Sequence, residues 1–173
     1  MKKILSYFVG LFILIFTGCE KNESNPSSNG KVELYLVETY SKIEYSSQIN
    51  ESSVVTKDSP LIYYQDFLSY DTSKYTFELS TNAIESIKKL EHSVNGLAFA
   101  IKANDTLIYT GYFWPSYSSA SCDCIVIDPF MTSVGNKIQV NLGYPGLVQG
   151  QIIEDKRNDK RITRIFKQDK KLK

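Results

Sequence analysis

A short apolar run near the start of the chain, over residues 4–16, ends just before Cys19. Lys2 and Lys3 precede the run, and small or polar residues separate it from the cysteine. Its 13 residues are fewer than the roughly 20 that a helix needs to cross a bilayer, and no second run of that length follows. The pattern predicts an export signal over residues 1–18, so the folded part of the protein must be built from the residues that follow.

The stretch Phe16-Thr17-Gly18-Cys19 resembles a bacterial lipobox, the motif whose cysteine thiol receives a diacylglycerol and becomes the first residue of the mature protein. Phe16 stands where the lipobox usually has leucine, a departure associated with Bacteroidota. The resemblance implies that Cys19 is lipidated and anchors the protein to a membrane, because each buried CH2 of an acyl chain contributes about 0.8 kcal/mol. An ordinary secretory signal with a chance cysteine is the alternative.

Residues 19–30 are polar and rich in turn formers, which is typical of a flexible tether. Lys21 followed by Glu23 resembles the acidic signal that sends Bacteroidota lipoproteins to the outer face of the outer membrane. Asn22 interrupts that signal. We therefore expect an outer-membrane lipoprotein whose domain faces either the periplasm or the cell surface.

Without residues 1–18 the chain keeps 155 residues, a length typical of one domain, which we place over residues 31–173. It then has 18 Lys and Arg against 19 Asp and Glu, a net charge of −1. This balance argues against a nucleic-acid partner. Residues 156–173 nevertheless hold nine Lys or Arg against two Asp. A solvated helix face is the simpler interpretation, and contact with anionic lipid head groups or polysaccharide is the alternative.

Alternating and β-branched apolar patterns predict strands over residues 31–37, 75–79, 97–102, 106–113, 124–127 and 137–142. The third and fourth of these flank Ala103-Asn104-Asp105 and predict a hairpin. Residues 41–59 form a long polar stretch, with four aliphatic side chains to pin it to the domain: Ile43, Ile49, Val54 and Val55. Residues 65–70 are expected to form one helical turn.

Ser80 is suited to cap a helix, and four apolar residues after it fall on one helical face: Ala83, Ile84, Ile87 and Leu90. We expect this helix to end near His92, before the turn signal Asn95-Gly96. The apolar spacing within residues 159–166 predicts a short C-terminal helix. Strands mixed with one central and one C-terminal helix, without strict alternation, predict a single α+β domain with a mainly antiparallel sheet.

Two resemblances bear on this chain. The stretches YTFELSTNAIESIKKL and GLAFAIKANDTLIYTGYF are similar in their order of elements to the head of the first periplasmic domain of SecD, a protein-export subunit, and this likeness bears on the fold alone. The stretches TGYFWPSYSSASCD, IDP, LGYPG and DKRNDKRI resemble a set of uncharacterised Bacteroidota lipoproteins. That second resemblance spans most of the mature chain, implies an envelope lipoprotein and brings no assigned activity.

The aromatic stretch around Trp114 is the strongest binding candidate. Pro115 ends the strand at Trp114 and makes the following serine-rich segment a loop. Exposed aromatic residues with a polar group bind protein partners or sugar rings, so we expect a binding patch of Tyr112, Trp114 and Tyr117. The simpler interpretation is that the aromatic residues at the strand end belong to the core.

Cys122 and Cys124 leave two alternatives open. The two cysteines are two residues apart, so in a regular strand their Cα atoms would lie about 6.6 Å from each other. This distance is near the upper limit for a disulfide, so a bridge would require a bulge or turn. Otherwise they are free thiols, with Cys124 acting as a small buried hydrophobic residue. Zinc normally needs four ligands and the chain has one histidine, so we expect no metal and no cofactor.

A hydrolase of the cell envelope is the rival interpretation, with Asp123, Asp128 or His92 as its catalytic residues. The chain shows no Gly-x-Ser-x-Gly motif, no HExxH motif and no phosphate-binding loop. His92 beside the end of a helix is explained by the helix dipole. The expected function is therefore that of a lipid-anchored envelope module that binds an envelope protein, or else a glycan, and carries no catalytic residues of its own.

Overall fold

The computed structural model describes residues 30–131 and 135–173, so the predicted export signal, Cys19 and nearly all of the predicted tether lie outside the described residues. The strands are β1 (Val32–Thr39), β2 (Val55–Thr56), β3 (Phe67–Asp71), β4 (Thr76–Leu79), β5 (Leu97–Ala103), β6 (Thr106–Phe113), β7 (Cys122–Ile127) and β8 (Lys137–Tyr144). The helices are α1 (Thr81–Lys88) and α2 (Lys160–Gln168), with the 3-10 turns η1 (Glu51–Ser53) and η2 (Tyr64–Asp66). Neither α-helix in the described ranges has the length and apolar character that crossing a membrane requires.

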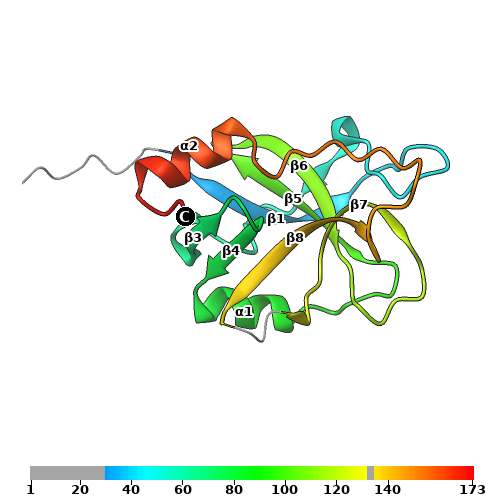
Figure 1. Ribbon diagram of the computed structural model, residues 1–173, viewed down its shortest axis with the longest axis horizontal. Coiled ribbons are helices and arrows are strands. Elements are labelled where there is room, and N and C mark those ends of the chain that lie inside the picture. The colour runs from blue at the N-terminus through cyan, green and yellow to red at the C-terminus, as the bar shows by residue number, and fades with distance from the viewer. Residues whose placement is uncertain (1–29, 132–134) are drawn as a thin grey trace, which may run out of the picture.

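The eight strands form one sheet in the order β2-β1-β5-β6-β7-β8-β4-β3 (Figure 1). Every named neighbour pair is antiparallel except β6 and β7, which are parallel. The expected α+β fold with a mainly antiparallel sheet is confirmed. The expected hairpin is β5–β6, whose two-residue turn places Asn104 and Asp105 at φ of 50° and 64°, the left-handed conformation that the tight type I′ turn requires.

The sheet curves so that its two ends approach each other. Leu34 of β1 forms an isolated bridge with Ile62, which leads into η2 and β3 at the far end of the strand order. The principal core therefore draws on both ends of the sheet, with Val32 and Leu34 from β1 and Phe77 and Leu79 from β4 in one buried cluster. Figure 1 shows α2 along the upper side of the sheet and α1 along the lower side.

Both helices follow the sequence signals closely. The Ser80 hydroxyl accepts a hydrogen bond from the backbone N–H of Ala83 at 3.2 Å and caps α1. The Asp159 carboxylate caps α2 in the same way at Arg161, and the hydrogen bonds from the Arg161 side chain and backbone lower the pKa of Asp159 to about 2. Helix α1 ends at Lys88, so the end predicted near His92 is placed four residues too far along the chain.

Two segments differ from expectation. Residues 65–70 were expected to be one helical turn, but only η2 is helical and Phe67 begins strand β3. The reason is tertiary: β3 pairs with β4, and Phe67 and Tyr70 are fully buried. The chain end also joins this edge, because Leu172 forms a parallel bridge with Tyr70.

Candidate functional site

The end of β6 is buried. Tyr112 is 1% exposed and Trp114 is 5% exposed, and both belong to a second apolar cluster on the other face of the sheet. Trp114 lies over Gly96, where a Cβ would come within 2.7 Å of the indole ring. The expected binding patch of Tyr112, Trp114 and Tyr117 is therefore corrected, because the first two pack in the core and only Tyr117 is exposed, at 59%.

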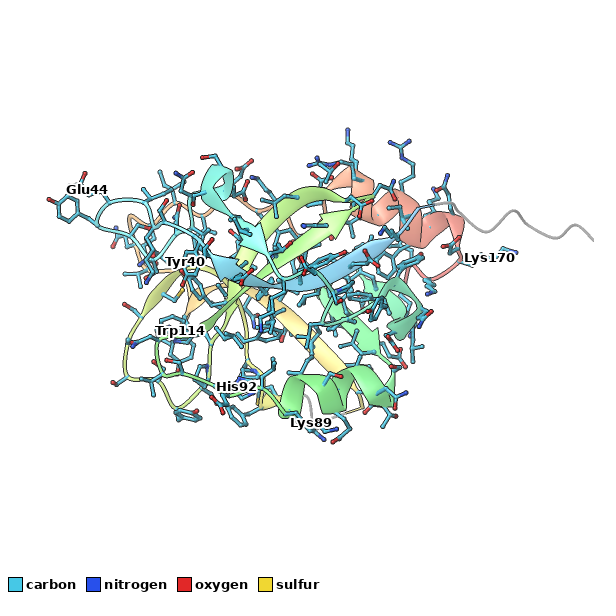
Figure 2. All side chains as sticks on the ribbon, turned by 180° about the vertical axis from the view of Figure 1, so that it is seen from behind. Tyr40, Glu44, Lys89, His92, Trp114 and Lys170 are labelled. Atoms are coloured by element: carbon cyan, nitrogen blue, oxygen red, sulfur yellow. The ribbon has the colours of Figure 1, made fainter. Side chains whose placement is uncertain are left out.

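An exposed aromatic surface does form nearby, from three loops. The Tyr117 and Phe130 rings have their centroids 5.4 Å apart, and Phe130 also meets His92 at 5.1 Å in an edge-on arrangement. The Ser118 hydroxyl donates a hydrogen bond to the Val94 carbonyl at 2.7 Å, which joins two of the loops. The exposed apolar residues here are Val94, Tyr117, Phe130 and Met131, and we call them the aromatic loop surface. Figure 2 shows His92 and Trp114 at this side of the molecule.

Sequence reasoning found Tyr117 but missed Phe130 and Met131. They follow Asp128-Pro129, and the Asp128 carboxylate accepts a hydrogen bond from the Phe130 backbone N–H at 2.9 Å. An Asp-Pro step followed by two large apolar residues marks a turn that carries exposed side chains, and this signal was available. That the turn lies against the Tyr117 loop depended on the packing of distant segments.

The three residues of the hydrolase alternative make separate contacts. Neither ring nitrogen of His92 has a hydrogen-bond partner among the described residues, so no described carboxylate orients the ring. The Asp128 carboxylate accepts a hydrogen bond from the Phe130 backbone N–H and stabilises the turn in which both residues lie. Asp123 accepts hydrogen bonds from the Ser46 hydroxyl at 2.6 Å and the Ser47 backbone at 2.8 Å.

Asp123 ties the loop of residues 43–48 to β7. Partial burial alone would raise the pKa of Asp123, but the hydrogen bonds from Ser46 and Ser47 outweigh burial and hold that pKa below its usual value. A carboxylate with a lowered pKa and partners fixed by the fold is poorly suited to act as a general base near neutral pH. The hydrogen bonds of Asp123 to Ser46 and Ser47 therefore indicate a structural role.

Cys122 and Cys124 are free thiols in the structure and are 1% and 5% exposed. The pairing of β7 with β8 is irregular between Cys122 and Ile125, and both thiols lie in the cluster that contains Trp114. A hydrogen bond with Cys122, together with burial, raises the pKa of the Cys124 thiol well above its usual value. Because the thiolate is the reactive form, the Cys124 thiol is a poor nucleophile.

A cavity of about 260 Å³ opens where β6 and β7 separate. Their ladder pairs only Gly111 to Phe113 with Ile125 to Ile127. The walls include Gln48 and Glu51 from the segment between β1 and β2, Thr110 from β6 and Lys156 from the segment before α2. The volume lies just below the roughly 300 Å³ at which pockets for drug-sized ligands begin.

The charged groups of this cavity neutralise one another. The Lys156 ammonium lies 3.0 Å from a Glu51 carboxylate oxygen and 3.2 Å from one of Glu154. Burial alone would lower the Lys156 pKa, but the hydrogen bonds to the two carboxylates outweigh burial and raise it. The two acids therefore converge on a lysine of the protein, whereas an acid–base pair would have to face a substrate.

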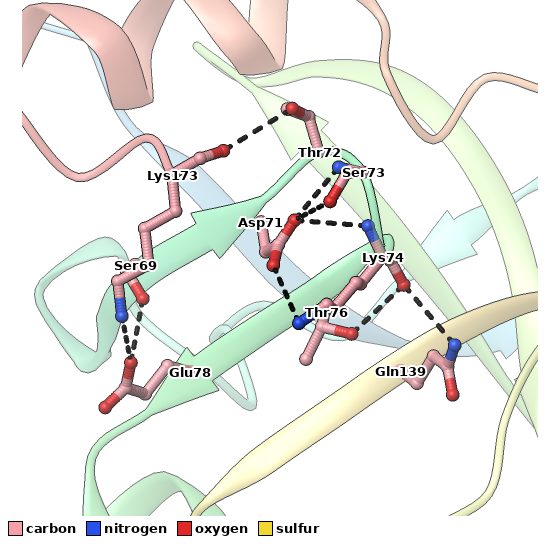
Figure 3. Close-up of polar contacts among 9 residues, drawn as sticks. All are labelled: Ser69, Asp71, Thr72, Ser73, Lys74, Thr76, Glu78, Gln139 and Lys173. Carbon is pink, nitrogen blue, oxygen red and sulfur yellow. Dashed lines mark hydrogen bonds and ion pairs between the residues drawn. The ribbon is translucent and has the colours of Figure 1, made fainter.

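The basic C-terminal segment divides into engaged and free cations. Lys173 closes onto β3 and β4, with its ammonium 2.6 Å from Glu78 and its carbonyl accepting from the Thr72 hydroxyl at 3.5 Å (Figure 3). Arg157 is buried, forms an ion pair with Asp155 and stacks 3.5 Å above the Tyr75 ring. Including Lys156, Arg161 and Lys171, five of the nine cations have protein partners.

Comparison with known proteins gives no identification: no family model, curated protein or solved structure matches this chain. The resemblances to SecD and to uncharacterised Bacteroidota lipoproteins therefore stay predictions. Within residues 30–131 and 135–173, no group of three or more His, Cys, Asp or Glu side chains is placed to hold a metal ion.

Proposed function

We propose that this protein is a lipid-anchored envelope lipoprotein that binds a protein partner through the aromatic loop surface, at the outer membrane and facing the periplasm or the cell surface. The observation that carries the binding part is the contact between Tyr117 and Phe130. Two half-exposed aromatic rings from separate loops pack on each other at 5.4 Å and leave their outer faces to solvent. Neighbouring Val94 and Met131 are 53% and 68% exposed and extend the apolar area.

The composition of this surface favours a protein partner over a glycan. Valine, methionine and phenylalanine side chains lack the donors and acceptors that sugar hydroxyls need. Aromatic residues and methionine are enriched in protein–protein interfaces. The Tyr117 and Phe130 rings are tilted by 49°, which suits an interdigitating side chain better than the broad C–H face of a sugar ring.

The hydrolase remains the alternative function. Its strongest support would be a pocket with converging catalytic groups. Among the described residues, Glu51 and Glu154 pair with Lys156 and Asp123 binds the loop at Ser46. His92 has no hydrogen-bonded carboxylate in this part of the chain. A substrate-dependent activity that His92→Ala removed without unfolding the protein would favour the hydrolase.

The anchor can be tested by metabolic labelling with an alkyne analogue of palmitate. We expect the full chain to be labelled and to sediment with membranes, and we expect Cys19→Ala to lose the label completely, because this cysteine is the proposed acylated residue. Cys122→Ser is the matched control and is expected to keep the label, since that thiol is buried. Label that persisted in Cys19→Ala would contradict the anchor.

The partner surface can be tested by photo-crosslinking in intact cells, with a photoreactive phenylalanine in place of Tyr117. We expect one dominant protein adduct, and we expect Phe130→Ser to reduce its yield at least tenfold, since removing a central aromatic anchor typically costs about 2 kcal/mol or more of binding free energy, or about 30-fold in affinity. Tyr45 is 99% exposed and lies outside the aromatic loop surface, so the same probe there is the matched control.

The outcomes of this test separate the alternatives. Equal adducts from positions 45 and 117 would show that exposure alone produces crosslinks, and this would contradict the proposed surface. Adducts at position 117 that contained only polysaccharide would replace the protein partner with a glycan. The Phe130→Ser protein is expected to keep its thermal midpoint, because Phe130 is half exposed.

A further inference from the structure

Helix α2 carries a row of free cations on its outer side. Lys160, Arg164 and Lys167 are spaced four and three residues apart, so they share one helical face, and Lys170 continues the row just after the helix. The opposite face holds the buried Ile162, Ile165 and Phe166. Within the described ranges none of the four exposed cations makes an ion pair or a cation–π contact.

The acidic groups around α2 are already occupied. Asp159 pairs with Arg161 at 2.7 Å, and Asp169 accepts a hydrogen bond from the Tyr64 hydroxyl at 2.7 Å. Glu51 pairs with Lys156 on the neighbouring segment. From Asp159 to Lys170 there are five cations and two carboxylates, which leaves an excess of three positive charges. Among residues 30–131 and 135–173, no carboxylate forms an ion pair with this positively charged face.

The chain enters the folded domain against this same helix. A Cβ at Gly30 would lie 2.8 Å from the Ile165 side chain, so Gly30 packs directly on α2. Lys31 then fixes the entry point, because its backbone N–H donates to the Asn104 side chain at 2.9 Å. An anchor attached before Gly30 in the sequence would therefore join the domain beside the basic face of α2.

The length of the segment ahead of Gly30 limits the distance to the membrane. The tether that the sequence predicts over residues 19–30 would have a root-mean-square span of about 20 Å as a polar, Ser- and Asn-rich chain. Electrostatic attraction to a charged surface extends over about 8–10 Å at moderate salt. A domain held this close samples contact with the membrane continually, so a modest electrostatic attraction is enough to orient it.

We propose that the α2 face formed by Lys160, Arg164, Lys167 and Lys170 rests on the phosphate head groups of the membrane that holds the anchor. This inference rests on the proposed lipid anchor, and it adds a second, electrostatic contact that sets the orientation of the domain. Figure 2 places Trp114 and His92 on the side of the molecule away from Lys170. With α2 on the membrane, the aromatic loop surface therefore points outward, toward a partner.

The test uses the full-length lipidated protein in vesicles of phosphatidylcholine, with or without phosphatidylglycerol. A fluorophore is attached to Gln168→Cys on α2 or to Glu44→Cys, which Figure 2 places at the opposite end of the molecule from Lys170. The native Cys122 and Cys124 are buried, so labelling is selective. Lipids with a nitroxide head group quench a fluorophore that lies at the membrane surface.

We expect quenching at position 168 to be about threefold stronger than at position 44 in anionic vesicles, and we expect the difference to vanish at high salt. Each basic residue near an anionic surface strengthens the contact by about fivefold. Reversing three of them together, Lys160→Glu, Arg164→Glu and Lys167→Glu, is therefore expected to abolish the difference. The matched control, Lys57→Glu, Lys88→Glu and Lys89→Glu, changes the net charge equally and is expected to preserve it.

Equal quenching at the two positions in anionic vesicles would overturn the proposal, as would an equal effect of the two triple variants. Failure of the anchor is recognised separately. An acylated Cys19 by intact mass and flotation with neutral vesicles establish the anchor, whereas the quenching difference reports the α2 contact. If the mass shows no acyl group, the α2 contact can still be tested with the unlipidated protein. Selective binding to anionic vesicles that is abolished only by the Lys160, Arg164 and Lys167 reversal would support the α2 contact. A lack of such binding would overturn the proposed contact.

Discussion

Replacing Phe166 with alanine is expected to lower the free energy of unfolding by about 3–5 kcal/mol. Phe166 is fully buried, and its ring centroid lies 5.6–6.0 Å from those of four aromatic neighbours: Tyr64, Phe67, Tyr70 and Phe77. These come from η2, β3 and β4, so the ring joins α2 to the end of the sheet. Its removal leaves a cavity among rigid rings that cannot collapse into the space.

Urea denaturation followed by Tyr and Trp fluorescence measures this loss, and Phe130→Ala is the matched control. Phe130 is 48% exposed, so its truncation is expected to change stability by less than about 0.5 kcal/mol while strongly reducing the photo-crosslink at position 117. The two phenylalanines thereby separate folding from binding. Similar destabilisation by both variants would contradict the assignment of Phe130 to a surface and Phe166 to the core.

Replacing Gly111 with alanine is the second change expected to have a large effect, a loss of about 3 kcal/mol, the upper end of the usual cost of overpacking. A Cβ at Gly111 would come within 2.4 Å of the Ile125 carbonyl oxygen and 2.7 Å of the Phe99 ring. The first contact is with backbone, which cannot rotate away as a flexible side chain does. Strands β6 and β7 would have to move apart, although their parallel ladder has only three register pairs.

Gly146→Ala provides the control, because a Cβ there meets nothing within 4 Å. We expect Gly146→Ala to keep the thermal midpoint within a few degrees of the wild type and Gly111→Ala to lower it by about 6–12 °C, given about 2–4 °C per kcal/mol for a domain of this size. Equal midpoints for the two variants would show that the central parallel pair tolerates a methyl group, against the close approach seen at Ile125.

The sequence predicted the local elements well where a physical signal was confined to neighbouring residues. Ser80 with the apolar spacing after it gave α1, and the Asn104-Asp105 step gave the β5–β6 turn, because capping and turn conformation depend on a few adjacent side chains. Strand β3 was missed because its extended conformation depends on pairing with β4 and on burial of Tyr70. Likewise, Leu172 joins the sheet edge only because α2 returns the chain to it.

The candidate site was predicted in part. Tyr117 was found, but Tyr112 and Trp114 were expected to be exposed and are buried. A strand's alternation tells which side chains share a face and leaves open whether another segment covers that face. Here the Tyr40 ring packs edge-on at 6.0 Å from the Tyr112 ring, and the Ser47 carbonyl accepts a hydrogen bond from the Tyr112 hydroxyl at 3.0 Å. The Tyr144 ring packs 6.4 Å from that of Trp114.

What the sequence determined by itself is the α+β class, the Ser80-capped helix, the C-terminal helix and the β5–β6 hairpin. It also predicts an export signal that ends just before Cys19. Each follows from periodicity or from chemistry within a few residues. The tertiary structure decided which aromatic rings reach solvent, because exposure depends on what distant segments cover. It also decided that the free cations of α2 lie beside the point where the chain enters the domain, since Gly30 and Ile165 meet only through folding.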